Sequence, residues 1–153
     1  MKKTIYIILL SIIVVSCDNN IYYHNSQDFD NETWSVGEIV KSEVEFLDSL
    51  DVFNFYFVIR NTEDYPNMNL FLFLKTEYPN GQYSMDTLEC MLADQSGKWY
   101  GKGNGKIKDT KILFKPKIRF SELGIYKFEI QHGMRVDKLK GIKSAGILIE
   151  SVK

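Results

Sequence analysis

The chain has 153 residues, a formal net charge of −1 and an aromatic content of 14%, with only three prolines. A charge this close to neutrality gives no reason to expect nucleic acid as a partner. The many aromatic residues favour strands.

The first residues are typical of a secretion signal. Lys2 and Lys3 precede an apolar stretch over residues 5–15, which is shorter than the roughly 20 residues of a membrane-spanning helix but fits a signal peptide. The stretch ends in Val14-Val15-Ser16-Cys17, which resembles the lipobox of bacterial lipoproteins. Cleavage there would leave Cys17 at the N-terminus, where its sulfur takes up a diacylglycerol. The alternatives are an ordinary signal peptide or a buried strand with a chance cysteine.

The lipobox predicts three parts of the chain. Residues 1–16 would be the lipoprotein signal peptide, residues 17–33 the lipidated cysteine and a polar tether, and residues 34–153 one folded domain. The acyl chains, palmitate among them, would anchor the protein without a spanning segment. Without residues 1–16 the chain has 17 basic and 20 acidic residues, a net charge of about −3.

A period of two dominates the chain beyond the predicted tether. Phe53, Phe55, Phe57 and Ile59 would share one face of a strand, and residues 126–130 alternate in the same way. Residues 68–75 are apolar on both faces, as in a central strand that is covered on both sides. Further strands are predicted over residues 34–40, 82–88, 111–114, 118–120 and 145–152.

Turn-forming residues separate these strands. Tyr78-Pro79-Asn80-Gly81 places Asn-Gly between two strand patterns, which is a strong hairpin signal. Other breaks fall at residues 61–67, 101–105, 121–124 and 132–133, and no segment has a convincing helical stripe. The sequence therefore predicts an all-β fold, a single antiparallel β-sandwich of the jelly-roll or immunoglobulin-like kind.

Residues with catalytic chemistry are few. The two histidines, His24 and His132, lie in the tether and at a strand end, without a metal-binding spacing. No Gly-x-Ser-x-Gly motif supplies a serine nucleophile. If Cys17 carries lipid, Cys90 cannot form an intramolecular disulfide, and we expect it to be buried. We therefore expect no enzyme, no metal or other cofactor and no small-molecule substrate.

One segment, residues 96–106, combines four glycines and three lysines with the pair Trp99-Tyr100. Residues 98–119 as a whole contain eight basic side chains and only one acidic side chain. A basic edge beside exposed aromatic rings could meet anionic lipid, a glycan or an acidic partner. The alternative is that the lysines protect an edge strand from pairing and that the glycines form tight turns.

A series of short motifs occurs along the chain, and their order is more specific than any one of them. They are Arg60-Asn61, Asp64-Tyr65-Pro66, Asn69-Leu70-Phe71, Tyr78-Pro79-Asn80-Gly81, Asp86-Thr87-Leu88-Glu89, Leu92-Ala93-Asp94, Gly97-Lys98-Trp99 with Gly101 and Gly103, Ile130-Gln131-His132-Gly133-Met134-Arg135, and Gly141-Ile142. In this order and spacing, from about residue 34 to residue 150, the chain resembles the gliding-motility lipoprotein family GldH. It departs from the family pattern at Gly133, where the family has alanine, and glycine permits a turn or bulge that alanine would resist.

The resemblance implies a non-catalytic component or assembly factor of the bacterial gliding motility and type IX secretion machinery. Such a lipoprotein would sit in the outer membrane, facing the periplasm. Its partners would be the membrane, through the N-terminal lipid, and other gliding or type IX secretion envelope proteins. The alternative function is a glycan-binding surface lipoprotein, which would present a flat row of exposed aromatic rings.

The residues themselves suggest where a partner would bind. Our first candidates are Lys98, Trp99, Tyr100 and Lys102, because the lysines flank an aromatic pair. The second candidates are Asp64, Tyr65 and Pro66, together with His132, Met134 and Arg135. For each of these residues the alternative is a structural role, since a tryptophan more often fills a core than a partner's pocket.

Overall fold

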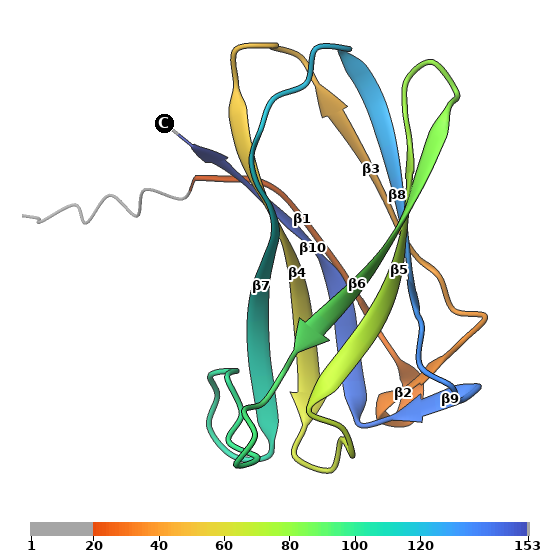
Figure 1. Ribbon diagram of the computed structural model, residues 1–153, viewed down its shortest axis with the longest axis vertical. Coiled ribbons are helices and arrows are strands. Elements are labelled where there is room, and N and C mark those ends of the chain that lie inside the picture. The colour runs from red at the N-terminus through yellow and green to blue at the C-terminus, as the bar shows by residue number, and fades with distance from the viewer. Residues whose placement is uncertain (1–19, 153) are drawn as a thin grey trace, which may run out of the picture.

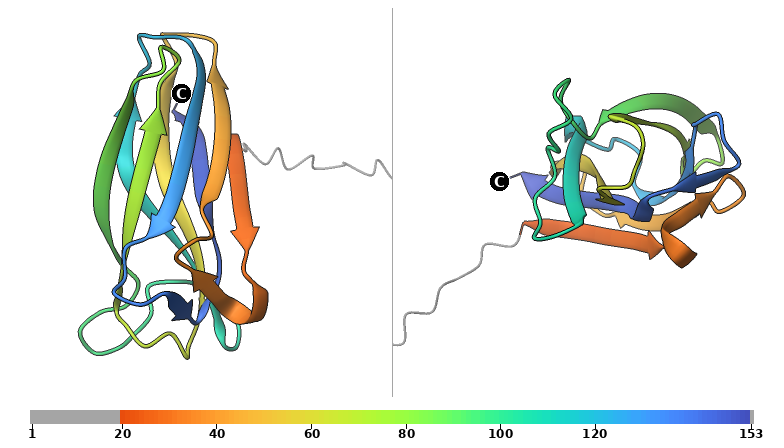
Figure 2. Two further views of the ribbon diagram at one scale, coloured as in Figure 1. Left: turned by 90° about the vertical axis from the view of Figure 1, so that its right-hand side faces the viewer. Right: turned by 90° about the horizontal axis from the view of Figure 1, so that it is seen from below.

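In a computed structural model, residues 20–152 are described and form two four-stranded antiparallel sheets packed face to face (Figures 1 and 2). The first sheet has the strand order β1 (Ile21–Asp28), β10 (Ile142–Val152), β4 (Val52–Thr62) and β7 (Ile107–Ile118). The second has the order β3 (Val40–Phe46), β8 (Gly124–His132), β5 (Asn69–Glu77) and β6 (Tyr83–Met91). The predicted antiparallel sandwich is confirmed, whereas the predicted signal peptide and Cys17 lie outside the described residues.

The strand pairing is nested. Strand β5 pairs with β6, β4 with β7, β3 with β8 and β1 with β10, so each pair encloses the one before it along the chain. The chain is thus a long hairpin rolled into two sheets, which is the jelly-roll arrangement and not the immunoglobulin-like one. The loops after β3, β5 and β7 lie at the upper end in Figure 1, and those after β4, β6 and β8 lie at the lower end.

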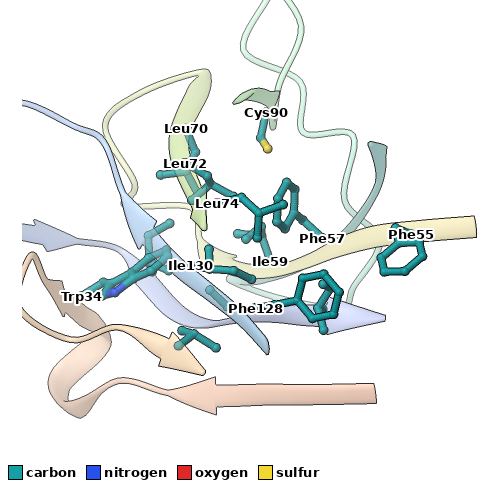
Figure 3. Packing of buried hydrophobic residues seen from close by; sticks show 14 of the residues in the cluster. Trp34, Phe55, Phe57, Ile59, Leu70, Leu72, Leu74, Cys90, Phe128 and Ile130 are labelled. Carbon is teal, nitrogen blue, oxygen red and sulfur yellow. The ribbon is translucent and has the colours of Figure 1, made fainter. Parts of the chain in front are cut away.

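The alternating side chains of β4 form the centre of the core. Phe53, Phe55, Phe57 and Ile59 are buried, while the residues between them are half-exposed. They lie among the inward side chains of β5 and β8 (Figure 3). A strand with one face in the core and one toward solvent needs this period of two, as the sequence predicts.

Strand β5 is covered on one side only, and the expectation that both its faces are covered is wrong. Leu70, Leu72 and Leu74 are fully buried, whereas Phe71 is half-buried and Phe73 is 38% exposed. The two phenylalanines lie on the outer face of the second sheet, and among residues 20–152 no further layer covers that face. The sequence pattern showed two apolar faces but could not show that one of them stays open.

The predicted tether over residues 17–33 is wrong from residue 21 onward. Residues 21–28 form β1, which pairs with β10 from Ile21 opposite Glu150 to Asp28 opposite Ser144. The next residues form the 3-10 helix η1 (Asp30–Glu32) and β2 (Thr33–Ser35), and β2 pairs with β9 (Lys138–Lys140). The polar side chains misled the prediction because β1 is an edge strand whose outer face meets solvent.

Two further boundaries differ from the prediction. The single strand expected over residues 34–40 is split, because Glu38 N–H donates to Ser35 O (2.9 Å) in a turn before β3 begins. The strands expected over residues 111–114 and 118–120 belong to one longer strand, β7, which ends before Phe120. An irregular register and a positive φ of 52° at Lys117 mark the interruption between the two predicted segments.

The predicted Asn-Gly hairpin is confirmed between β5 and β6. Tyr78 N–H donates to Gln82 O (2.8 Å), and Gly81 N–H donates to Tyr78 O (2.9 Å). Gly81 has a φ of +83°, a backbone conformation that glycine adopts without the steric cost of a Cβ atom.

The substitution Gly146→Ala tests whether β1 belongs to the domain. A Cβ atom at Gly146 would overlap the carbonyl oxygen of Asn25 in β1, so β1 would have to move away from β10. We expect the free energy of unfolding, measured by chemical denaturation, to fall by about 1–3 kcal/mol. Gly37→Ala is the matched control, since nothing lies within 4 Å of its Cβ position. Equal stability of the two variants would contradict the packing of β1.

Candidate interaction surface

The loops that contain the predicted contact residues lie at one end of the sandwich, the lower end in Figure 1. We call it the interaction end and define it by the β4–β5 loop (residues 63–68), the β6–β7 loop (residues 92–106) and the β8–β9 loop (residues 133–137). Leu92 N–H donates to Met68 O (2.7 Å), which joins the first two loops. Gly133 N–H donates to Phe71 O (2.7 Å) and fixes the third loop against β5.

A turn around Asp94 shapes the β6–β7 loop. The Asp94 carboxylate accepts hydrogen bonds from the Ser96 hydroxyl (2.6 Å), Ser96 N–H (2.8 Å) and Lys98 N–H (3.0 Å). These hydrogen bonds, the Ser96 hydroxyl foremost, hold the pKa of Asp94 below its ordinary value. The turn brings Ala93 opposite Trp99, so the local chain conformation is set by side-chain hydrogen bonds.

This turn separates the predicted aromatic pair. The Trp99 side chain is half-buried and packs against the hydrophobic core, as the structural alternative expected. The neighbouring Tyr100 is 59% exposed, and Lys98 and Lys102 are exposed as well. Tyr100 and the two lysines are therefore accessible to a partner, whereas much of Trp99 is not.

Burial removes Tyr65 from the candidate contacts. Its ring is in the core, its hydroxyl donates to Asn69 O (2.8 Å), and burial raises its pKa to about 12. Gly141, with a φ of +86°, lies so close that a Cβ atom would be 2.6 Å from the Tyr65 Cα. The motifs around residues 65 and 141 thus meet in a packing contact. Asp64 and Pro66 on either side of Tyr65 remain exposed.

His132 is also removed from the candidate contacts. Its imidazole is buried edge-on against Trp34, with ring centroids 5.4 Å apart, and within residues 20–152 neither ring nitrogen has a hydrogen-bond partner of good geometry. Burial lowers the pKa of His132 because the charged form loses its hydration, while the backbone of Trp34 and the charge of Asp137 act in the opposite direction. The ring is therefore a neutral part of the core at neutral pH.

The residues after His132 line a groove of about 510 Å³ on the outer face of the second sheet. Its walls include Phe71 and Phe73 from β5 and Met134, Arg135 and Val136 from the β8–β9 loop. The Met134 sulfur accepts the Phe71 N–H at 3.4 Å, which holds the loop over the strand. The groove is thus apolar with one guanidinium group at its rim.

Sequence reasoning found Met134 and Arg135 among the residues of this groove and missed its other apolar side chains. Phe71, Phe73 and Val136 were not candidates, although the apolar second face of residues 68–75 was a signal that β5 has an exposed apolar side. Gly133 also lines the groove, and its backbone is not left-handed. A Cβ atom there would lie 3.0 Å from the Phe73 ring, so packing in the groove and not a special turn would oppose alanine.

The basic residues of β7 have the structural role that the edge-strand alternative expected. Strand β7 is at the edge of the first sheet. Three of its lysines lie beside carboxylates of neighbouring elements: Lys108 beside Glu63 (3.1 Å), Lys111 beside Glu150 (2.5 Å) and Lys115 beside Asp86 (3.1 Å). Charged side chains along an edge discourage pairing with another chain, which explains the excess of lysine.

The structure also places the residues that could bind a metal ion or act as a thiol nucleophile. Across residues 20–152, no three His, Cys, Asp or Glu side chains lie close enough together to bind a metal ion. Cys90 is buried, as predicted, and burial raises its pKa to about 12, which disfavours the thiolate.

Over the same residues, no helix has the length and apolar character needed to cross a membrane.

Comparison with known proteins gives one consistent result. The family model described as "GldH lipoprotein" matches residues 21–149. The "Gliding motility lipoprotein GldH homolog" of Christiangramia forsetii is 33% identical over 96% of this chain and 94% of that protein. The "Gliding motility lipoprotein GldH" of Flavobacterium johnsoniae is 30% identical over 97% and 96%. Among solved structures, "Structure of infectious bursal disease virus Gx strain" is 16% identical, and the match covers 85% of this chain and 29% of that one. Its TM-score of 0.33 is too low to indicate a shared fold.

Separate substitutions of Trp99 and Tyr100 should have different effects. We expect Trp99→Ala to lower the free energy of unfolding by about 1–3 kcal/mol, because its ring packs against the core. Tyr100→Ala should change it by no more than about 0.5 kcal/mol, because the ring is exposed. Denaturant titration of both variants checks this, and a large loss of stability in Tyr100→Ala would contradict the described loop.

His132 should make stability depend on pH. Because its pKa is lower in the folded state than the ordinary 6.5, its stabilising effect is complete above about pH 6.5 and declines as the pH falls toward the folded-state pKa. When the pH is lowered from about 7.5 to about 5.5, the free energy of unfolding should fall in both proteins. The fall should be up to about 1.4 kcal/mol smaller in His132→Phe than in the wild type. Equal losses in the two proteins would show that His132 is not buried as a neutral group.

Proposed function

The chain belongs to the GldH lipoprotein family, and from this membership we propose that it is a lipid-anchored, non-catalytic component of the gliding machinery. The family match over residues 21–149 carries the proposal, because it spans nearly the whole described sandwich. The names of both relatives assign them to gliding motility and to the lipoproteins. We propose a role in assembling or supporting the gliding and type IX secretion complexes of the envelope.

We propose Cys17 as the lipidated residue. It follows the apolar stretch of a signal peptide directly, and the lipobox-like residues 14–17 place it where cleavage would free its amine. The acyl chains would confine the domain to a thin layer, which raises its effective concentration against membrane partners. We further propose the outer membrane as its location, with the domain in the periplasm.

We propose the groove at the interaction end as the main contact with a partner protein. Phe71 and Phe73 offer two aromatic rings, and Met134 adapts its shape because its thioether chain is flexible and polarisable. Arginine and aromatic side chains dominate the binding energy of protein interfaces, and Arg135 stands at the rim of this groove. An exposed apolar groove with a polar rim is what a partner's side chains need.

Exposed residues of the neighbouring loops extend the proposed contact. Tyr100, Lys98 and Lys102 lie on the β6–β7 loop, and Asp64 and Pro66 lie on the β4–β5 loop that is hydrogen-bonded to it. We propose these residues as the rim of the interface, where single charges contribute little affinity but help orientation.

No described feature favours the glycan-binding alternative. Within residues 20–152, the exposed aromatic side chains Tyr22, Phe73, Tyr83 and Tyr100 come from β1, β5, β6 and the β6–β7 loop. Phe73 is paired with Thr87, four residues along β6 from Tyr83, so even these two rings do not form a continuous platform. A sugar chain would need adjacent rings to stack on.

The substitution Val136→Asp tests the groove. Val136 is an exposed residue of the groove wall, and a carboxylate there would oppose the entry of an apolar partner side chain. We expect in-cell crosslinking of the lipoprotein to its main envelope partner to fall at least about tenfold, which corresponds to the loss of one interface hot spot. Spreading of the cells over a surface should fall with it.

Leu113→Asp is the matched control. Leu113 is similarly exposed but lies on β7, the edge strand of the other sheet. It should leave both crosslinking and spreading unchanged. Unchanged crosslinking and spreading in the Val136→Asp strain would refute the groove as the contact. If mass spectrometry of the crosslinked material recovered only polysaccharide, the assembly role would be refuted.

A further inference from the structure

The end of the sandwich opposite the interaction end has an apolar rim. Leu47 and Leu50 in the β3–β4 loop are 71% and 76% exposed, the highest values among the large hydrophobic side chains of residues 20–152. Leu123 in the β7–β8 loop and Ile125 at the start of β8 are also exposed. Leucines this open to water cost free energy unless something apolar covers them in use.

Strand register brings these side chains together. Strands β3 and β8 pair Glu45 with Ile125 and Phe46 with Gly124, and one more step in the same register would bring Leu47 opposite Leu123. Leu50 follows in a turn in which its N–H donates to the Asp48 carboxylate (2.8 Å). The rim is therefore built by ordered elements and is not a chance scatter of leucines.

The start of the described chain is fixed to this rim. The Tyr22 hydroxyl donates to Glu45 O (2.6 Å), two residues before Leu47. The Tyr22 ring stacks on Phe46 with centroids 5.7 Å apart and contacts Phe53 at 4.7 Å. Ile21 and Tyr22 are themselves exposed on their outer side, so the rim continues onto β1.

The length of chain between the lipid and β1 limits where this rim can lie. Four residue steps separate Cys17 from Ile21, and even a fully extended chain spans no more than about 14 Å over them. The strands of the sandwich are longer than this, since the eleven residues of β4 extend roughly 35 Å. A lipid on Cys17 therefore keeps the Tyr22 end near the bilayer, while the far end can point away from it.

We propose that the rim of Ile21, Tyr22, Leu47, Leu50, Leu123 and Ile125 is a second membrane contact, which seats this end of the sandwich in the headgroup region of the bilayer. The inference rests on the proposed lipid anchor at Cys17. It goes beyond that anchor because it sets the orientation of the domain, with the interaction end directed away from the membrane. Tyrosine and leucine are suited to this depth, where an apolar side chain enters the acyl boundary and a hydroxyl stays wet.

The charges in the rim indicate which kind of lipid surface it can bind. Asp48 and Asp51 stand in the same loop as the two exposed leucines. Their carboxylates give no attraction to anionic lipids, so the contact depends on apolar burial. A zwitterionic phosphatidylcholine bilayer is therefore a sufficient probe.

The test places an environment-sensitive fluorophore at either end of the full-length lipidated protein. Leu50→Cys labels the rim, and Met68→Cys, also an exposed loop residue, labels the interaction end. Cys90 does not compete for the label, because it is buried and its thiolate is disfavoured. Both proteins are bound to phosphatidylcholine vesicles with and without doxyl-labelled acyl chains, and flotation first measures their attachment.

We expect both variants to float with the vesicles and the label at position 50 to be quenched at least about twofold more than the label at position 68. If both variants floated and their two labels were quenched equally, the second membrane contact alone would be overturned. The exposed leucines would then be a contact for a protein partner. A lipidated protein that failed to float would overturn the anchor, and this inference with it. The two failures are therefore distinguishable in one experiment.

Discussion

The row of side chains that β4 directs into the interior is the interaction on which the rest of the structure depends. Strand β4 is hydrogen-bonded to both β10 and β7, and its inner face touches the opposite sheet through contacts such as Phe55 with Phe128, whose ring centroids are 5.8 Å apart. Phe57 stacks on Phe114 of β7 at 4.1 Å, so the same row also holds the edge strand. Because aromatic pairs have geometric preferences as well as large buried areas, this row fixes how the two sheets face each other.

The rolled hairpin gives the domain two ends with different surfaces. Since the strands from β3 to β8 run between the two ends of the sandwich, the loops that follow them alternate between the ends (Figure 1). The end that contains the exposed leucines is joined to β1 through Tyr22, and the other end has the groove of Phe71, Phe73 and Arg135. In a lipoprotein this polarity is useful, because an anchor on one side leaves the opposite side free for partners.

Burial decides which of the conspicuous side chains can act on a partner. Trp99, Tyr65 and His132 are the residue types that a sequence reader notices first, yet the core takes up the last two entirely and much of Trp99. The accessible residues are less conspicuous: two phenylalanines on an outer strand face, a methionine, an arginine and a valine. An aromatic or histidine in a small β-sandwich is first a source of buried area, and only its surroundings make it a contact.

The sequence alone determined the strand class, most of the strand positions, the Asn-Gly hairpin, the burial of Cys90 and the family, because each of these depends on local periodicity, turn chemistry or motif order. Tertiary structure alone decided that residues 21–28 pair with β10, that the jelly roll and not the immunoglobulin-like order is adopted, and that three loops far apart in sequence share one end. It also decided that β5 leaves one apolar face open while Tyr65 and His132 are enclosed. The physical reason is the same throughout. An alternating sequence pattern shows that a strand has two different faces, but long-range pairing decides what covers each face.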